Sequence, residues 1–163
     1  MSLKTKLVMI ITMLLGGFFG LLNETLLTTA LPSIMKDFHI QYSQVQWLTT
    51  AFLLTNGVVI PLSALVIQRF TTRQVFLTGI LIFFIGTIVG GFSPNFTILL
   101  FARIIQALGS GIMMPLMMTT ILDIFEPHER GKYMGIFGLV IGLAPAIGPT
   151  PVSYTHLTLP TTP

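Results

Sequence analysis

Long apolar stretches separated by short polar segments dominate the pattern along this chain. A helix that crosses the hydrocarbon core of a bilayer needs about 20 mostly apolar residues. Five stretches reach or approach that length, and Glu24 and Arg103 are the only charged residues within them. The five stretches are residues 7–31, 47–67, 75–92, 96–122 and 133–150. The pattern therefore predicts about five membrane-spanning segments.

Each of these stretches is predicted to be a helix rather than a strand. A spanning segment must satisfy its backbone hydrogen bonds internally, and the strands of a membrane barrel would alternate in polarity over about ten residues. The stretches do not alternate, and the segments that join them are short, as expected between antiparallel neighbours in a bundle. The expected fold is an all-α membrane protein, an antiparallel transmembrane helix bundle. An outer loop is expected around residues 32–46.

The composition agrees with a membrane protein and excludes several soluble classes. Of the 163 residues, 53% are hydrophobic and 8% are charged, whereas a soluble domain carries about 25% charged residues. A water-soluble enzyme is therefore excluded. The net charge of +3 comes from scattered bases, so the clustered basic face of a nucleic-acid-binding protein is missing. With no cysteine, the chain offers neither a disulfide nor a thiolate ligand for a metal.

The basic residues predict the orientation in the membrane. Cytoplasmic loops of membrane proteins are enriched in Lys and Arg. With a cytoplasmic amino terminus, Lys36 is the one loop base outside, and the opposite orientation breaks the rule. The bases placed inside are Lys4, Lys6, Arg69, Arg73, Arg130 and Lys132.

The first apolar stretch has a second interpretation, and so does the end of the chain. Lys4 and Lys6 before an apolar run are also typical of a signal peptide. Glu24 interrupts the run and no small-residue cleavage site follows, which favours a retained helix. Residues 152–163 (VSYTHLTLPTTP) resemble a translated sequencing-library adapter. We expect a non-native tail there and an amino-terminal fragment in residues 1–151; a natural extracellular segment is the alternative.

Charged groups within a membrane span are costly and often mark a transport or proton route. Counting the helical rise of about 1.5 Å per residue places Glu24 and Arg103 both roughly 10 Å beneath the outer boundary. A pair between them, direct or through water, would respond to protonation of Glu24. We therefore predict a proton-coupling role for both residues. A purely structural ion pair, or Glu24 opening onto the outer face, is the alternative.

Other residues in the spans are candidates for a substrate cavity or for helix packing. Polar groups and methionines can line an adaptable pocket, although hydrogen bonds between helices and ordinary packing are the commoner uses. The candidate cavity residues are Asn23, Asn56, Gln106 and Met113. Small residues and prolines in the fifth stretch predict close helix packing and kinks. The residues of this packing surface are Gly138, Gly142, Pro145, Gly148 and Pro149.

Four segments together resemble motifs of the major facilitator superfamily, in the drug:proton antiporter branch with about fourteen spans. Residues 22–32 (LNETLLTTALP) resemble the motif L-D-x-T-x-x-x-x-A-L-P, with Asn23 at the aspartate position and the carboxylate displaced to Glu24. Residues 102–109 (ARIIQALG) resemble a-R-x-x-Q-G-x-G and contain Arg103.

The other two matches lie in the loop after the second helix and in the fifth stretch. Residues 64–73 are similar to the gating motif G-x-L-a-D-R-x-G-R-R; Arg69 and Arg73 are present, and Gln68 replaces the acid. The alternative is that these arginines only anchor the protein at the inner face of the membrane through their positive charge. Gly148-Pro149 resembles the end of the antiporter motif. The resemblance covers residues 7–151 and implies part of an amino-terminal six-helix bundle.

The resemblance implies a multi-pass plasma-membrane transporter that exports drug-like, amphiphilic or cationic molecules in exchange for protons. It implies no bound cofactor, the proton being the coupling ion. The partners implied are the lipid bilayer and a missing carboxy-terminal bundle of the same chain. Two alternatives are a truncated fragment without transport activity and an uncoupled facilitator of another small solute. A membrane-embedded hydrolase would need a catalytic constellation, whereas before the tail the histidines are His39 and His128, both in loops.

Overall fold

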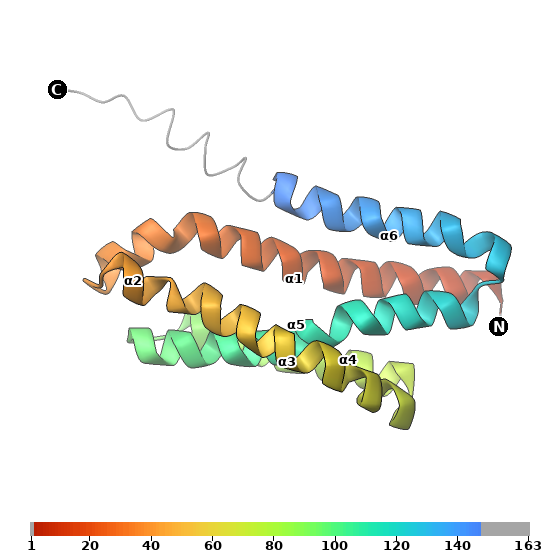
Figure 1. The fold of residues 1–163 in the computed structure, drawn as a ribbon, viewed down its shortest axis with the longest axis horizontal. Helices are drawn as coiled ribbons and strands as arrows, with labels where there is room; N and C mark the ends of the chain where they lie inside the picture. The colour runs from red at the N-terminus through yellow and green to blue at the C-terminus, as the bar shows by residue number, and fades with distance from the viewer. Residues whose placement is uncertain (1, 148–163) are drawn as a thin grey trace.

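The structure, a computed structural model, describes residues 2–147, and within that range it is helical without strands. Five long helices run back and forth through the molecule, and a single short helix lies between the first two of them (Figure 1). The helices are α1 (Leu3–Asp37), α2 (Tyr42–Val45), α3 (Trp47–Arg69), α4 (Thr72–Gly91), α5 (Phe96–Ile124) and α6 (Pro127–Ile147). The expected all-α antiparallel bundle is therefore confirmed.

Polar side chains fix where several helices begin. The hydroxyl of Ser2 accepts a hydrogen bond from the Thr5 amide at the start of α1, and the Asn95 side chain accepts one from Ile98 at the start of α5. Thr71 caps α4 in the same way. These bonds satisfy backbone donors that the first helical turn leaves without a partner. The short connections before α4 and α5 are thus encoded by capping residues.

Four segments of the described chain are long and apolar enough to cross a membrane: α1, residues 42–69, α4 and α5. The 21-residue helix α6 begins with a charged turn and is not among those four. The fifth predicted stretch, residues 133–150, runs past the described residues. The first helix is longer than predicted, because α1 continues through Pro32 to Asp37, where the sequence suggested a loop. A membrane helix tolerates a proline whose missing hydrogen bond is compensated locally.

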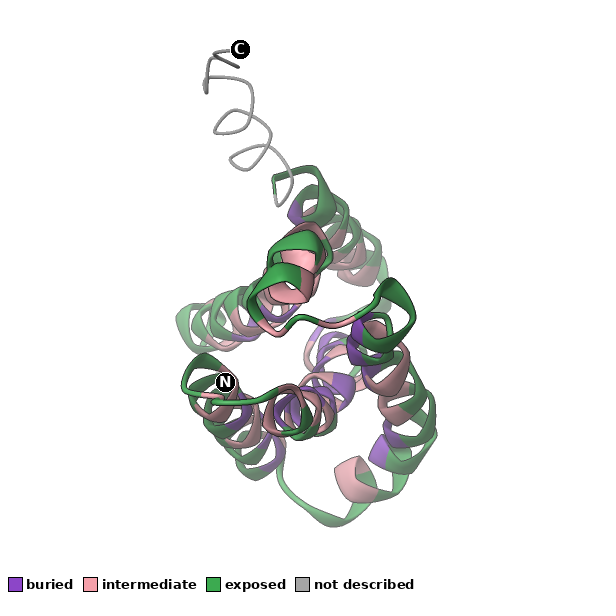
Figure 2. Ribbon diagram, turned by 90° about the vertical axis from the view of Figure 1, so that its left-hand side faces the viewer, coloured by how far each residue is buried: buried purple, intermediate pink, exposed green. Residues whose placement is uncertain are grey.

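Helix α5 is the centre of the bundle. It packs most extensively against α4 and α3, whereas α1 packs against α6 and α5. Figure 2 shows the buried positions facing the interior and the exposed positions on the periphery. The buried residues of α5 are Ala102, Arg103, Gln106, Ala107, Gly109, Gly111, Met113, Leu116, Met117, Thr120 and Ile121. The charged Arg103 and the polar Gln106 and Thr120 of this helix therefore lie inside the bundle.

Glycine allows α4 and α5 to approach each other closely. A Cβ atom at Gly109 would lie 2.5 Å from the carbonyl oxygen of Gly79 and 2.6 Å from the amide nitrogen of Phe83, both on α4. Small residues at such contacts are the usual way in which membrane helices pack, since lipid tails are as apolar as the side chains. The outer faces carry exposed apolar side chains that suit contact with lipid, among them Leu53, Leu54, Leu81, Phe84 and Phe101.

The carboxyl end of α5 is tied to α1 and α6. The Lys6 Nζ donates a hydrogen bond of 2.9 Å to the carbonyl oxygen of Ile124, and the Arg130 Nε donates one of 3.1 Å to that of Phe125. The rings of Phe125 and Tyr133 stack with centroids 3.7 Å apart. Cations near a helix carboxyl terminus satisfy its free carbonyls and complement the helix dipole. This cluster joins α1, α5 and α6 at one end of the bundle.

Candidate functional site: a cavity with one carboxylate

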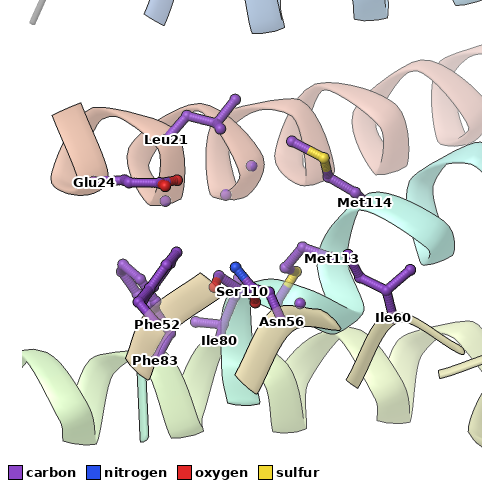
Figure 3. A pocket seen from close by; sticks show the side chains of 14 residues that line it. Leu21, Glu24, Phe52, Asn56, Ile60, Ile80, Phe83, Ser110, Met113 and Met114 are labelled. Carbon is purple, nitrogen blue, oxygen red and sulfur yellow. The ribbon is translucent and has the colours of Figure 1, made fainter. Parts of the chain in front are cut away.

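A cavity of about 80 Å³ lies between α1, α3, α4 and α5. Figure 3 shows Glu24 on α1 and, on the other side of the cavity, Phe52, Asn56 and Ser110. Glu24 is the single charged residue in the lining, which is otherwise mostly apolar. The lining residues are Gly16, Gly17, Gly20, Leu21, Glu24, Phe52, Asn56, Ile60, Ile80, Phe83, Ser110, Gly111, Met113 and Met114.

Glu24 is partly buried on α1 and faces this cavity. The glycines one and two turns earlier on α1 leave room between the helices, and Met113 and Met114 supply flexible apolar side chains on the facing helix α5. Methionine adapts its shape to irregular contacts. The cavity thus combines one ionisable group, the carboxyl of Glu24, with apolar walls whose methionine side chains can change shape.

Arg103 is held behind the wall of the cavity. Its side chain is 3% exposed, and it is not among the lining residues. Nη1 donates a hydrogen bond of 2.7 Å to Oε1 of Gln106, whose Nε2 donates one of 3.1 Å to Oγ1 of Thr87 on α4. The Phe52 ring of α3 lies 4.6 Å from Cζ of Arg103, a cation–π distance. Side chains from three helices therefore fix this guanidinium.

Glu24 and Arg103 interact electrostatically but form no direct ion pair. Among the described residues, one basic and one acidic side chain approach within 4 Å of each other: those of His128 and Glu126, which are both exposed. The Nε of Arg103 is buried and has no hydrogen-bond partner there. The two predicted coupling residues thus lie near each other, and the buried Nε donor of the guanidinium is unused.

The predicted cavity residues divide into two groups. Asn56 and Met113 line the cavity, whereas Asn23 and Gln106 do not. The Asn56 amide oxygen lies against Gly111, where a Cβ atom would be 2.7 Å away. Gln106 is engaged by Arg103 and Thr87 instead, and the Nδ2 of Asn23 is buried without a hydrogen-bond partner among the described residues.

The predicted gating residues lie together at the connection between α3 and α4. Gln68 and Arg69 end α3, Arg73 lies in the first turn of α4, and all three are exposed. Arg73 also borders an apolar groove of about 270 Å³ between α1 and α4. Their gating role stays a prediction.

The predicted packing surface on α6 is exposed within the described part of the chain. A Cβ atom at Gly138 or Gly142 would meet no other atom within 4 Å, and Pro145 is likewise exposed. Gly148 and Pro149 lie outside the described residues, as does the predicted tail 152–163. The described helices therefore contribute no contact to this glycine face.

Sequence reasoning missed Phe52, which contacts Arg103, and Thr87, which accepts a hydrogen bond from Gln106; both lie on neighbouring helices. The spacing of three residues between Arg103 and Gln106 puts both on one helix face and was a usable signal for their hydrogen bond. Phe52 carries no comparable signal, because it is one of many apolar residues in a uniformly apolar helix.

The helical bundle, with four segments long and apolar enough to cross a membrane, is that of a polytopic membrane protein. The Major Facilitator Superfamily profile matches residues 13–155, and the chain belongs to this superfamily. It is 58% identical over 138 residues to the uncharacterized MFS-type transporter YcnB of Bacillus subtilis (strain 168), covering 85% of this chain and 29% of the relative.

Two relatives have names that refer to drugs. The lincomycin resistance protein LmrB of Bacillus subtilis (strain 168) is 51% identical over 140 residues, covering 86% of this chain and 29% of LmrB. The multidrug transporter protein MdtP of the same organism is 37% identical over 147 residues, covering 90% of this chain and 27% of MdtP. The chain thus spans less than a third of the length of these curated relatives.

Proposed function

We propose that the complete transporter to which this chain contributes exports drug-like molecules across the plasma membrane in exchange for protons. The observation that carries the proposal is the single carboxylate of Glu24 in an apolar cavity, close to the buried cation Arg103. Ionisable groups placed in this way inside a membrane bundle commonly take part in proton transfer. The drug-related names of LmrB and MdtP support the substrate class.

In this mechanism Glu24 binds a proton from the outer side and releases it to the inner side. Protonation removes the negative charge that Arg103 senses and so changes the balance between two packings of the bundle. Asn56, Ser110 and the methionines of the cavity wall contact the part of the substrate that reaches this cavity. At about 80 Å³ the cavity admits a small group, so a drug-sized molecule needs further surface from the rest of the transporter.

The test is gradient-driven transport by the complete protein in proteoliposomes with an acidic interior. We expect the wild type to accumulate labelled lincomycin and to lose accumulation when the proton gradient is collapsed. Glu24→Gln should abolish gradient-driven accumulation while it preserves exchange of drug down its own gradient. The matched control is Glu126→Gln, which alters an exposed carboxylate outside the cavity.

Three results would contradict the proposal. Drug flux down its own concentration gradient that never becomes accumulation, and that is unchanged by collapse of the proton gradient, indicates an uncoupled facilitator, which is the second function considered for this chain. Full proton coupling in Glu24→Gln removes this residue from the role given to it. Absence of drug transport in the complete wild type, with intact folding, rejects drug export itself.

A further inference from the structure

Phe52 is the side chain that connects the carboxylate cavity with the buried cation. Its ring lines the cavity together with Glu24, and the same ring lies over the guanidinium of Arg103. We propose that Phe52 is a positioning residue that keeps Arg103 from pairing directly with Glu24, so that the carboxylate stays free to take up a proton. The inference deepens the proposed function and rests on its use of Glu24 as the proton-binding residue.

The contacts of Arg103 explain why a separator is needed. The guanidinium is held on the side of α4 through Gln106 and Thr87, and Phe52 covers its face. Opposite charges in a medium of low dielectric attract strongly. Without a side chain in the way, a carboxylate in the neighbouring cavity would form a charge-assisted hydrogen bond with this cation, which is the stronger kind.

Arg103 has a donor available for such a bond. Its Nε is buried and has no acceptor among the described residues. A buried donor without an acceptor is unfavourable, so the guanidinium would gain an interaction if a carboxylate reached it. Phe52 is 2% exposed and is among the largest fully enclosed side chains. The ring is therefore packed among protein groups, with the cavity on one side of it.

No second charge competes for Glu24 in the described structure. Of the helices packed against α1, α2 carries Tyr42, α4 carries Arg73, and α5 carries Arg103 and Asp123. The charged or titratable residues of α6, which also packs against α1, lie in its first two turns: His128, Glu129, Arg130, Lys132 and Tyr133. Arg103 is the group whose charge acts on Glu24. The remaining charged or titratable residues of the described chain lie at helix ends or in the connections between helices, namely Lys4, Lys6, Lys36, Asp37, His39, Arg69 and Glu126.

The test is an infrared titration of the Glu24 carboxyl group in the purified complete transporter. The band of the protonated carboxyl is assigned by its loss in Glu24→Gln and is followed against pH. A directly paired cation favours the charged carboxylate. We therefore expect Phe52→Leu to move the midpoint of this band to lower pH by about one unit, a roughly tenfold change in proton affinity.

Matched variants separate a positioning role from a merely structural one. Phe83→Leu removes an aromatic ring from the same cavity wall and should leave the midpoint in place, because no contact of Phe83 with Arg103 is recorded in the described structure. Phe52→Tyr keeps a ring over the guanidinium and should retain the wild-type midpoint. In an Arg103→Gln background, Phe52→Leu should produce no further downward shift, because no cation remains to reach Glu24.

An unchanged midpoint in folded Phe52→Leu, or a shift that persists without Arg103, would overturn the inference. If Phe52→Leu does not fold, loss of the wild-type midpoint in Phe52→Tyr also overturns it, and retention together with a shift in Phe52→Met supports it. The titration does not depend on transport. If the wild type transports no drug but Phe52→Leu shows the shift, only the proposed function is refuted. If the wild type shows proton-coupled transport but Phe52→Leu shows no shift, only the role of Phe52 is refuted.

Discussion

At the scale of single residues, Arg103 is the one charged side chain that is buried among the described residues. Burying a charge is costly unless hydrogen bonds compensate, and this guanidinium has one recorded hydrogen bond, to Gln106. Gln106 suits the position because an amide can accept from Arg103 and donate to Thr87 at once. An ionised carboxylate could only accept, so Thr87 would have to donate to it instead. Gln106 therefore acts as a structural link rather than as a cavity residue.

This link predicts the effect of replacing Gln106. Gln106→Leu leaves the buried cation without its recorded acceptor, and we expect it to lower the free energy of unfolding by about 1–2 kcal/mol. Gln68→Leu, at the exposed end of α3, should change it by less than about 0.5 kcal/mol. Reversible unfolding in mixed micelles measures both. Equal effects of the two substitutions would show that the link carries no net energy.

At the scale of helices, the sequence determines which segments are helical but not which faces meet. The apolar stretches predicted the long helices, and the helical rise placed Glu24 and Arg103 at similar depth. Lipid and protein interior are both apolar, so a membrane helix needs no polar face to mark its exposed side. The contact of Phe52 with Arg103 could not be inferred for that reason. The prediction of a loop beginning at Pro32 was wrong because α1 accommodates this proline and continues to Asp37.

For the glycines, the space around each position in the structure shows whether that face of the helix is packed against another helix. Gly109 of α5 lies against the backbone of α4, whereas a Cβ atom at Gly57 of α3 would meet nothing within 4 Å. Gly109→Ala should therefore force α4 and α5 apart and destabilise the bundle by about 1–3 kcal/mol. Gly57→Ala should be neutral or stabilising by up to about 1 kcal/mol, since alanine is the better helix former. Unfolding of the two variants under identical conditions gives the comparison, and equal losses would contradict the close packing of α4 and α5.

At the scale of the whole molecule, the two ends of the bundle differ in chemistry. One end carries the α3–α4 connection with Arg69 and Arg73, together with the cluster in which Lys6 and Arg130 bind the end of α5. The other end carries α2. Among the described residues, Lys36 is the one Lys or Arg at the helix ends there. Glu24 lies in the half of α1 nearer to α2, whereas Lys6 lies near its amino-terminal end. This asymmetry lets the basic residues predict the orientation of the bundle in the membrane.

The basic end is predicted to face the cytoplasm, by the enrichment of Lys and Arg in cytoplasmic loops. The 163 residues contain no cysteine, so single cysteines report their own positions within this chain. Ser43→Cys, in α2, should react with a membrane-impermeant maleimide in intact cells. Thr71→Cys, between α3 and α4, should react only after the membrane is permeabilised. The reverse pattern would place the basic end outside and contradict the orientation predicted from the basic residues.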